Sequence, residues 1–158
     1  MTNTNLTRLI ALAALIGGLL AGIVQVSQAA AGTEGVSLTD IKISFKLDQR
    51  LTRGQYMGDL WVSPPTYTRL QDGKELIVEA RVEGVDVKGT LMEISPTWTP
   101  SDPDMVAVSP GQGKEVKITV KYAGQSSLEV ASRGVTKKLS IKATAIHEGK
   151  VLQVEITQ

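Results

Sequence analysis

The chain has 158 residues, of which 42% are hydrophobic, and its formal charge is +1. This length allows one ordinary domain, with or without a targeting segment, and leaves no room for a second large core. A charge so close to zero argues against a duplex-binding protein, which would carry a basic stripe, so we expect no nucleic-acid partner. Cysteine is absent, which excludes disulfides, thiolate nucleophiles and zinc–thiolate sites.

The first 31 residues have the pattern of an export signal. Arg8 is their only ionisable side chain, and it precedes Leu9–Val24, which carries no charge. Alanines at 29–31 then offer a small-residue cleavage site. We therefore expect a signal peptide over 1–31 and a domain over 32–158 that works in the periplasm, outside the cell or at the cell surface. The alternative is an anchor that is not cleaved. A helix that spans a membrane needs about 20 apolar residues, and the run Leu9–Val24 is shorter than that. After cleavage we expect no stable membrane span.

After the signal, apolar residues recur at every second position. Ile41, Ile43, Phe45 and Leu47 alternate with polar residues, which indicates a strand with one buried face. Similar runs lie at 76–82, 105–108, 116–122, 126–131, 139–143 and 152–156. Turn residues separate them about every ten residues, the rhythm of a sandwich or barrel. We therefore predict an all-β domain with helix limited to a turn or two.

Glycine-containing turns lie between these runs. They are found at 71–74, 110–113, 123–124 and 148–149, and glycine readily adopts the positive φ that tight turns need. The last of them joins a run ending at Ala145 to a run beginning at Val151. The C-terminus is therefore predicted to be an antiparallel hairpin.

The block Ile94–Ala143 carries a series of short motifs. They are Trp98, Ser101-Asp102-Pro103, Val106 with Val108, Ala123-Gly124, Leu128 with Val130, and Gly134. With the strand at 76–82 ahead of it, this block resembles the bacterial immunoglobulin-like domains of group 2, which occur in intimin- and invasin-like surface proteins. The resemblance implies an immunoglobulin-like β-sandwich with a family-like core over 72–145 and Trp98 in that core. It also implies an extracytoplasmic binding or spacer role without catalytic residues, and the C-terminal hairpin is extra to the family pattern.

Few residues offer catalytic or metal chemistry, and each has a plainer interpretation. His147 lies at the predicted hairpin tip without a second histidine or a triad partner, so we interpret it as a solvated turn residue. Asp102 and Asp104 could contribute to a calcium site, but we favour an Asp-Pro turn whose side chains cap backbone amides. Ser126 and Ser127 lack a nucleophile motif and are interpreted as polar strand positions. Lys137-Lys138 is interpreted as a charged sheet edge that discourages strand addition.

The segment 48–70 is the candidate binding surface. It contains half of the six aromatic residues of the chain together with arginines, and aromatic residues and arginine dominate interface hot spots. Long connections in compact domains are also often functional. The predicted partner-binding residues are Arg50, Arg53, Tyr56, Met57, Asp59, Trp61 and Tyr67. The alternative is that Trp61 and Val62 form a strand that closes one end of the sandwich, with the tyrosines as lids.

Three function classes follow from these observations. We favour a non-catalytic binding or assembly module of the bacterial cell envelope or surface, which presents this patch to a protein or a glycan and needs no cofactor. An architectural spacer or filament subunit that assembles through sheet edges is the alternative. A secreted carbohydrate-active enzyme ranks last, because it needs a paired acid and base in a cleft.

Overall fold

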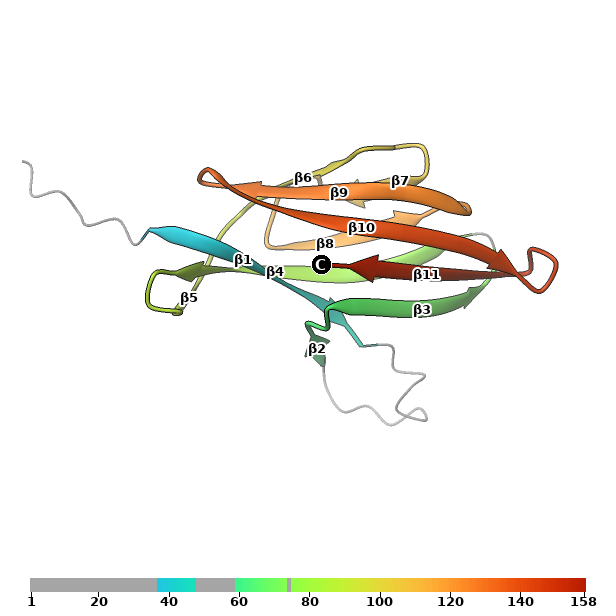
Figure 1. Cartoon of the computed structure of the whole chain (residues 1–158), viewed down its shortest axis with the longest axis horizontal. Coiled ribbons are helices and arrows are strands. Elements are labelled where there is room, and N and C mark those ends of the chain that lie inside the picture. The colour runs from blue at the N-terminus through green and yellow to red at the C-terminus, as the bar shows by residue number, and fades with distance from the viewer. Residues whose placement is uncertain (1–36, 48–58, 74) are drawn as a thin grey trace, which may run out of the picture. The chain divides into compact units, whose positions relative to one another are not determined.

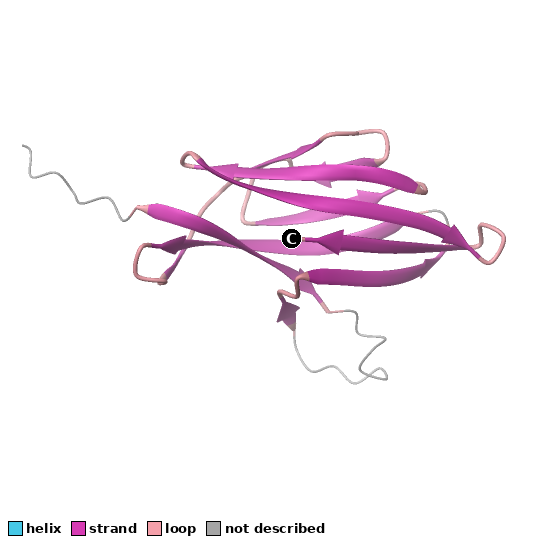
Figure 2. Ribbon diagram, viewed as in Figure 1, coloured by secondary structure: helices cyan, strands magenta, loops and turns pink. Residues whose placement is uncertain are grey.

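The computed structural model describes residues 37–47, 59–73 and 75–158, which form strands and no helix (Figure 1, Figure 2). The strands are β1 (Leu38–Lys46), β2 (Trp61–Val62), β3 (Thr66–Asp72), β4 (Leu76–Asp86), β5 (Leu91–Met92), β6 (Thr97–Pro100), β7 (Val106–Ser109), β8 (Glu115–Val120), β9 (Gly124–Ser132), β10 (Val135–Ile146) and β11 (Val151–Thr157). No membrane-spanning helix is found among the described residues. The predicted signal peptide lies outside them.

The strands form two antiparallel sheets. In sheet A the order is β2-β1-β4-β8-β7, and β5 pairs with β4 near its end. In sheet B the order is β3-β11-β10-β9-β6. The fold class predicted from the alternating pattern, an all-β sandwich that ends in a hairpin, is confirmed.

The C-terminal hairpin lies inside sheet B. Ile146 pairs with Val151 at its closed end, and β11 pairs with β3 on its other side, with Tyr67 opposite Ile156. The hairpin, which was predicted as extra to the family pattern, is thus part of sheet B, because β11 connects β3 to β10.

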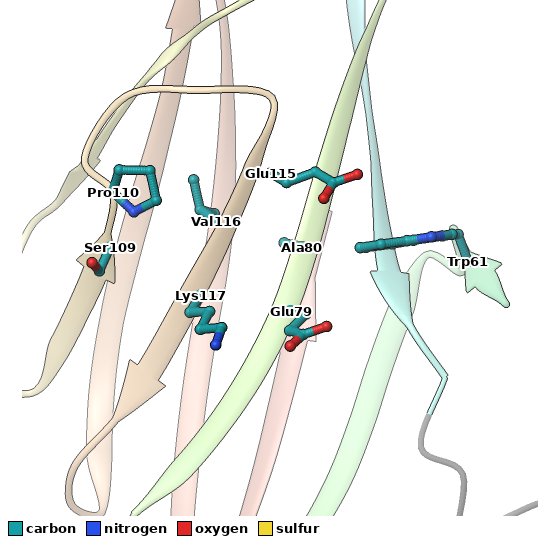
Figure 3. Close-up of a pocket in the computed structure, with 8 residues that line it drawn as sticks. All are labelled: Trp61, Glu79, Ala80, Ser109, Pro110, Glu115, Val116 and Lys117. Atoms are coloured by element: carbon teal, nitrogen blue, oxygen red, sulfur yellow. The ribbon is translucent and has the colours of Figure 1, made fainter. Parts of the chain in front are cut away.

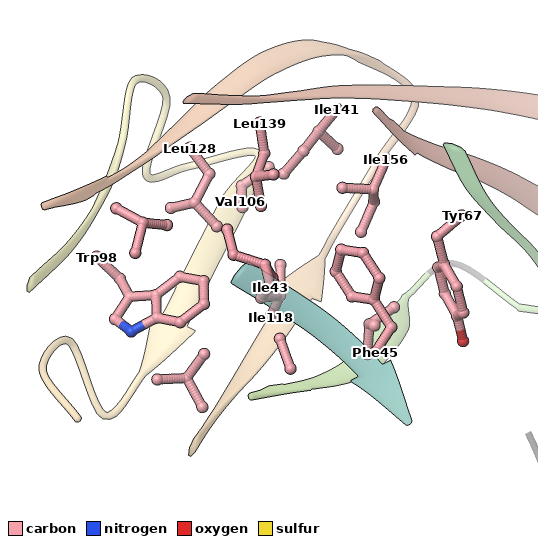
Figure 4. Close-up of a cluster of buried hydrophobic side chains, with 14 of the residues drawn as sticks. Ile43, Phe45, Tyr67, Trp98, Val106, Ile118, Leu128, Leu139, Ile141 and Ile156 are labelled. Atoms are coloured by element: carbon pink, nitrogen blue, oxygen red, sulfur yellow. The ribbon is translucent and has the colours of Figure 1, made fainter. Parts of the chain in front are cut away.

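The core lies between the two sheets (Figure 4). Ile41, Ile43 and Phe45 of β1 are fully buried, as are Leu139 and Ile141 of β10. This burial is what strict alternation predicts, because one face of each strand meets the other sheet.

Trp98 belongs to this core, as predicted. It is 3% exposed, and its indole Nε1–H donates a hydrogen bond of 3.0 Å to the carbonyl oxygen of Gly113. The ring thus buries its apolar surface while its single polar group is satisfied.

The structure corrects two sequence-based predictions. β8 ends at Val120 rather than at 122, and Tyr122 is 47% exposed. The strand ends there because the amide of Lys121 donates to the carbonyl of Met105 and the chain then turns into β9.

The segment predicted as one long connection, 48–70, contains β2 and most of β3. β3 was missed because Arg69 and Gln71 occupy inward positions of its alternation while Leu70 is exposed.

Candidate functional site

The candidate site lies on the outer face of sheet A and begins at the edge strand β2. Trp61 pairs with Lys46 of β1. The strand is held in place from both ends: Leu47 N–H donates to the carbonyl of Leu60 at 2.8 Å, and the Ser63 hydroxyl donates to the carbonyl of Ile43. Trp61 and Val62 therefore form a strand, as the alternative interpretation of this segment expected, and this strand lies at the edge of sheet A.

The Trp61 ring carries a cation on one face. The guanidinium carbon of Arg81 lies 4.7 Å from the ring centroid, within the range of a cation–π contact. Arg81 Nε is buried without a hydrogen-bond partner among the described residues. The Trp61 ring thus packs against this guanidinium.

Lys46 links the edge of the site to its centre. Its Nζ lies 3.0 Å from a carboxylate oxygen of Asp59 and 3.0 Å from one of Glu79. Hydrogen bonds to Asp59 first, and then to Glu79, raise the pKa of Lys46 above its ordinary value, because both favour the charged ammonium. Lys46 therefore stays protonated at any physiological pH.

Beyond Glu79, a pocket of about 410 Å³ opens on the same face (Figure 3). Trp61 reaches toward Ala80 from one side, and Ser109 and Pro110 close the other side. The lining residues are Trp61, Glu79, Ala80, Ser109, Pro110, Glu115, Val116 and Lys117. The volume lies within the range of small-molecule sites.

The structure divides the predicted binding residues into three groups. Asp59 and Trp61 belong to this site. Tyr67 does not: it is 7% exposed, stacks on Phe45 with ring centroids 4.7 Å apart, and donates from its hydroxyl to the carbonyl of Lys46. The remaining predictions, Arg50, Arg53, Tyr56 and Met57, lie outside the described residues.

Several residues of the site were missed by sequence reasoning. They are Lys46, Glu79, Arg81, Glu115 and Lys117. Each occupies a polar position of an alternating strand, the pattern of any solvated sheet face. The signal that could have found them is the charge alternation between paired strands, and it becomes visible only when the register of those strands is known.

The plainer interpretations of the other candidates fit the structure. Asp102 Oδ1 accepts hydrogen bonds of 3.0 Å from the amides of Asp104 and Met105, so it caps a turn. His147 is exposed at the hairpin tip with φ of 51°. Ser126 and Ser127 are polar positions of β9.

The lysine pair 137–138 lies on an open stretch of β10. That stretch, 135–139, pairs with β9 on one side, while β11 pairs only with the later part of β10, from Ser140 onward. Among the described residues, the other side of this stretch has no strand partner, as expected for a charged edge.

The described residues contain no cluster of three or more histidine or acidic side chains that could hold a metal ion. In comparisons with known proteins, no family model, curated protein or solved structure matches the chain.

Proposed function

We propose that the chain is an exported, non-catalytic binding module of the bacterial cell envelope or surface, which presents the Trp61 site to a protein or a glycan. The observation that carries the proposal is the arrangement of Trp61. Its ring is held from the sheet edge, contacts Arg81 at 4.7 Å and lines a pocket beside charged side chains. Tryptophan and arginine in such settings supply much of the energy of many interfaces.

The other premises of the proposal come from the sequence. Export rests on Arg8, the uncharged run Leu9–Val24 and the alanines that follow. A relationship to the group 2 bacterial immunoglobulin-like domains rests on the motifs of 94–143, and an antiparallel two-sheet sandwich is compatible with it. Arg53 and Tyr56, which precede Trp61 in the chain, are proposed to extend the binding surface.

The test compares Trp61→Ala, Arg53→Ala and Tyr56→Ala with Tyr122→Ala. Tyr122 is a matched control because it is an exposed aromatic that does not line the Trp61 pocket. Thermal stability and capture of envelope components are measured for each variant. We expect Trp61→Ala to weaken capture by about 2 kcal/mol or more, with little change in melting temperature, and Tyr122→Ala to capture normally. Normal capture by all three test variants would place the binding site elsewhere.

A second function, assembly through sheet edges, is favoured by one observation. β1 pairs with β2 only through Phe45 and Lys46, so among the described residues its stretch 38–44 has no strand partner on that side, although the Ser63 hydroxyl donates to the carbonyl of Ile43. Exposed edges can pair with a strand of another chain. Light scattering after size exclusion distinguishes the two functions, because assembly through this edge predicts oligomers whose size depends on concentration.

A further inference from the structure

We propose that the outer face of sheet A binds a neutral, unbranched oligosaccharide, which lies across the strands from Trp61 to Pro110. This inference rests on the proposed binding function and names its ligand class. Three features of the site carry it: its length, its balance of charge, and the kind of polar groups it offers.

The site is a row of side chains that crosses all five strands of the main path of sheet A. Trp61 pairs with Lys46, Lys46 contacts Glu79, Glu79 pairs with Lys117, and Lys117 pairs with Ser109. With neighbouring strands about 4.8 Å apart, the row is about 19 Å long. A surface of this length suits a chain of several small units better than a single compact ligand.

The charges of the row, taken with those of the side chains directly beside it, are balanced. Lys46, Arg81 and Lys117 are opposed by Asp59, Glu79 and Glu115. Such a surface has no net field with which to attract a polyanion or a polycation. The ligand that fits it is uncharged.

The polar groups suit hydroxyl recognition. Glu115 and Lys117 line the pocket, and neither forms an ion pair with another described residue. Carboxylates accept hydrogen bonds from hydroxyls and an ammonium donates to them. The part of the indole of Trp61 that lines the pocket supplies an apolar wall for the C–H face of a sugar ring.

An extended peptide fits this surface less well. The row lies on the face of the sheet, where the main-chain groups of β4 are already paired with those of β1 and β8, so a peptide cannot add as a strand there. The lining is dominated by ionisable and small side chains around one aromatic, whereas peptide anchors need apolar pockets.

The experiment titrates the purified full chain with maltohexaose, cellohexaose and chitohexaose by calorimetry. A protein-free neutral polysaccharide fraction of the source envelope is the fourth probe, and its periodate-oxidised form is the negative control. We expect at least one probe to bind. Trp61→Ala should raise the dissociation constant about tenfold or more, and Glu115→Gln and Lys117→Met about threefold each, while Tyr122→Ala leaves it unchanged.

Glu115 and Lys117 are exposed side chains of β8, so their variants keep the test valid if Trp61→Ala fails to fold. The inference is overturned if the wild type binds none of the four probes, or if Glu115→Gln and Lys117→Met bind as the wild type does. Capture of a protease-sensitive envelope component that still depends on Trp61 would then retain the binding function while rejecting a glycan ligand. If capture of that component did not depend on Trp61, both the glycan ligand and the proposed binding function of the Trp61 site would be rejected.

Discussion

The two tryptophans show how position decides the role of the same side chain. Trp98 sits between the sheets, 3% exposed and hydrogen-bonded to Gly113, whereas Trp61 lies on an outer face beside a pocket. Trp98→Ala should lower the free energy of unfolding by about 3–5 kcal/mol, because a large buried ring leaves a cavity. Trp98→Phe should cost less, since most of the ring volume stays. Denaturant titration measures both, and a loss below about 1 kcal/mol for the alanine variant would contradict the burial of Trp98.

Asp86 at the end of β4 gives a prediction about pH. It is 9% exposed, and its Oδ1 accepts hydrogen bonds from the amides of Thr90, at 2.7 Å, and Lys88, at 2.8 Å. The bond from Thr90 contributes most to holding the pKa of Asp86 below its ordinary value of 3.8. A lowered pKa means that the stabilisation is complete above that ordinary value and is lost as the pH falls through the folded-state pKa.

Thermal melts of the wild type and of Asp86→Asn between neutral pH and pH 2 test this prediction. The amide oxygen of asparagine can still accept the two bonds but does not titrate. The melting temperature of the wild type should therefore fall more steeply in the acid range than that of Asp86→Asn. Parallel curves for the two proteins would show that Asp86 does not contribute to the acid sensitivity.

At the scale of the element, the packing of β4 depends on Gly84, because side chains of β1 and of the segment around β5 fill the space beside it. A Cβ at Gly84 would lie 2.6 Å from Leu38 Cδ1, 2.8 Å from Met92 Cγ and 2.9 Å from Ile94 Cγ2. Gly84→Ala should therefore cost about 1–3 kcal/mol through overpacking. Gly111→Ala is the matched control, because nothing lies within 4 Å of its added Cβ, and its unfolding free energy should change by less than about 0.5 kcal/mol. Equal stability of the two variants in a denaturant titration would contradict the close packing around Gly84.

Alternation of apolar and polar residues in the sequence predicts only those strands whose inward-facing residues are apolar. β4, with Leu76, Val78, Ala80 and Val82 all buried, is the clearest case. β3 is the opposite case, because only Tyr67 among its inward residues is buried, and its partner β11 lies about 85 residues away in the chain. Its assignment as a strand depends on a long-range pairing that no local pattern encodes.

At the scale of the whole molecule, the same reason limits prediction of the candidate site. Trp61 was found because tryptophan is rare and lay in an unusual segment. Glu79 and Lys117 become neighbours only through the pairing of β4 with β8, and a shift of that register by one residue would put them on opposite faces of the sheet. Which side chains meet on a sheet face thus depends on the register of the paired strands. The residue pattern of a single strand does not determine that register.

The last strand, β11, joins β3 to the rest of sheet B, and this position gives a prediction about the whole fold. β11 lies between β3 and β10, and its residues Leu152, Val154 and Ile156 are at most 3% exposed. A chain that ends at Lys150 loses these side chains and leaves β3 without β11, its strand partner in sheet B. Since each large buried aliphatic contributes about 1.5–3 kcal/mol and a domain has only about 5–15 kcal/mol of net stability, we expect this chain not to fold cooperatively.

A peptide with the sequence of 151–158 should restore the fold when added to the truncated chain, because it supplies the missing strand of sheet B. The same peptide with Val154→Asp is the control, since it would place a charge in the core and should not restore folding. Near-UV circular dichroism of the buried Trp98 reports the packed state in each mixture. If the truncated chain alone showed the native near-UV signal and a cooperative melt, β11 would be an appendage, and the two halves of sheet B would be stable without it.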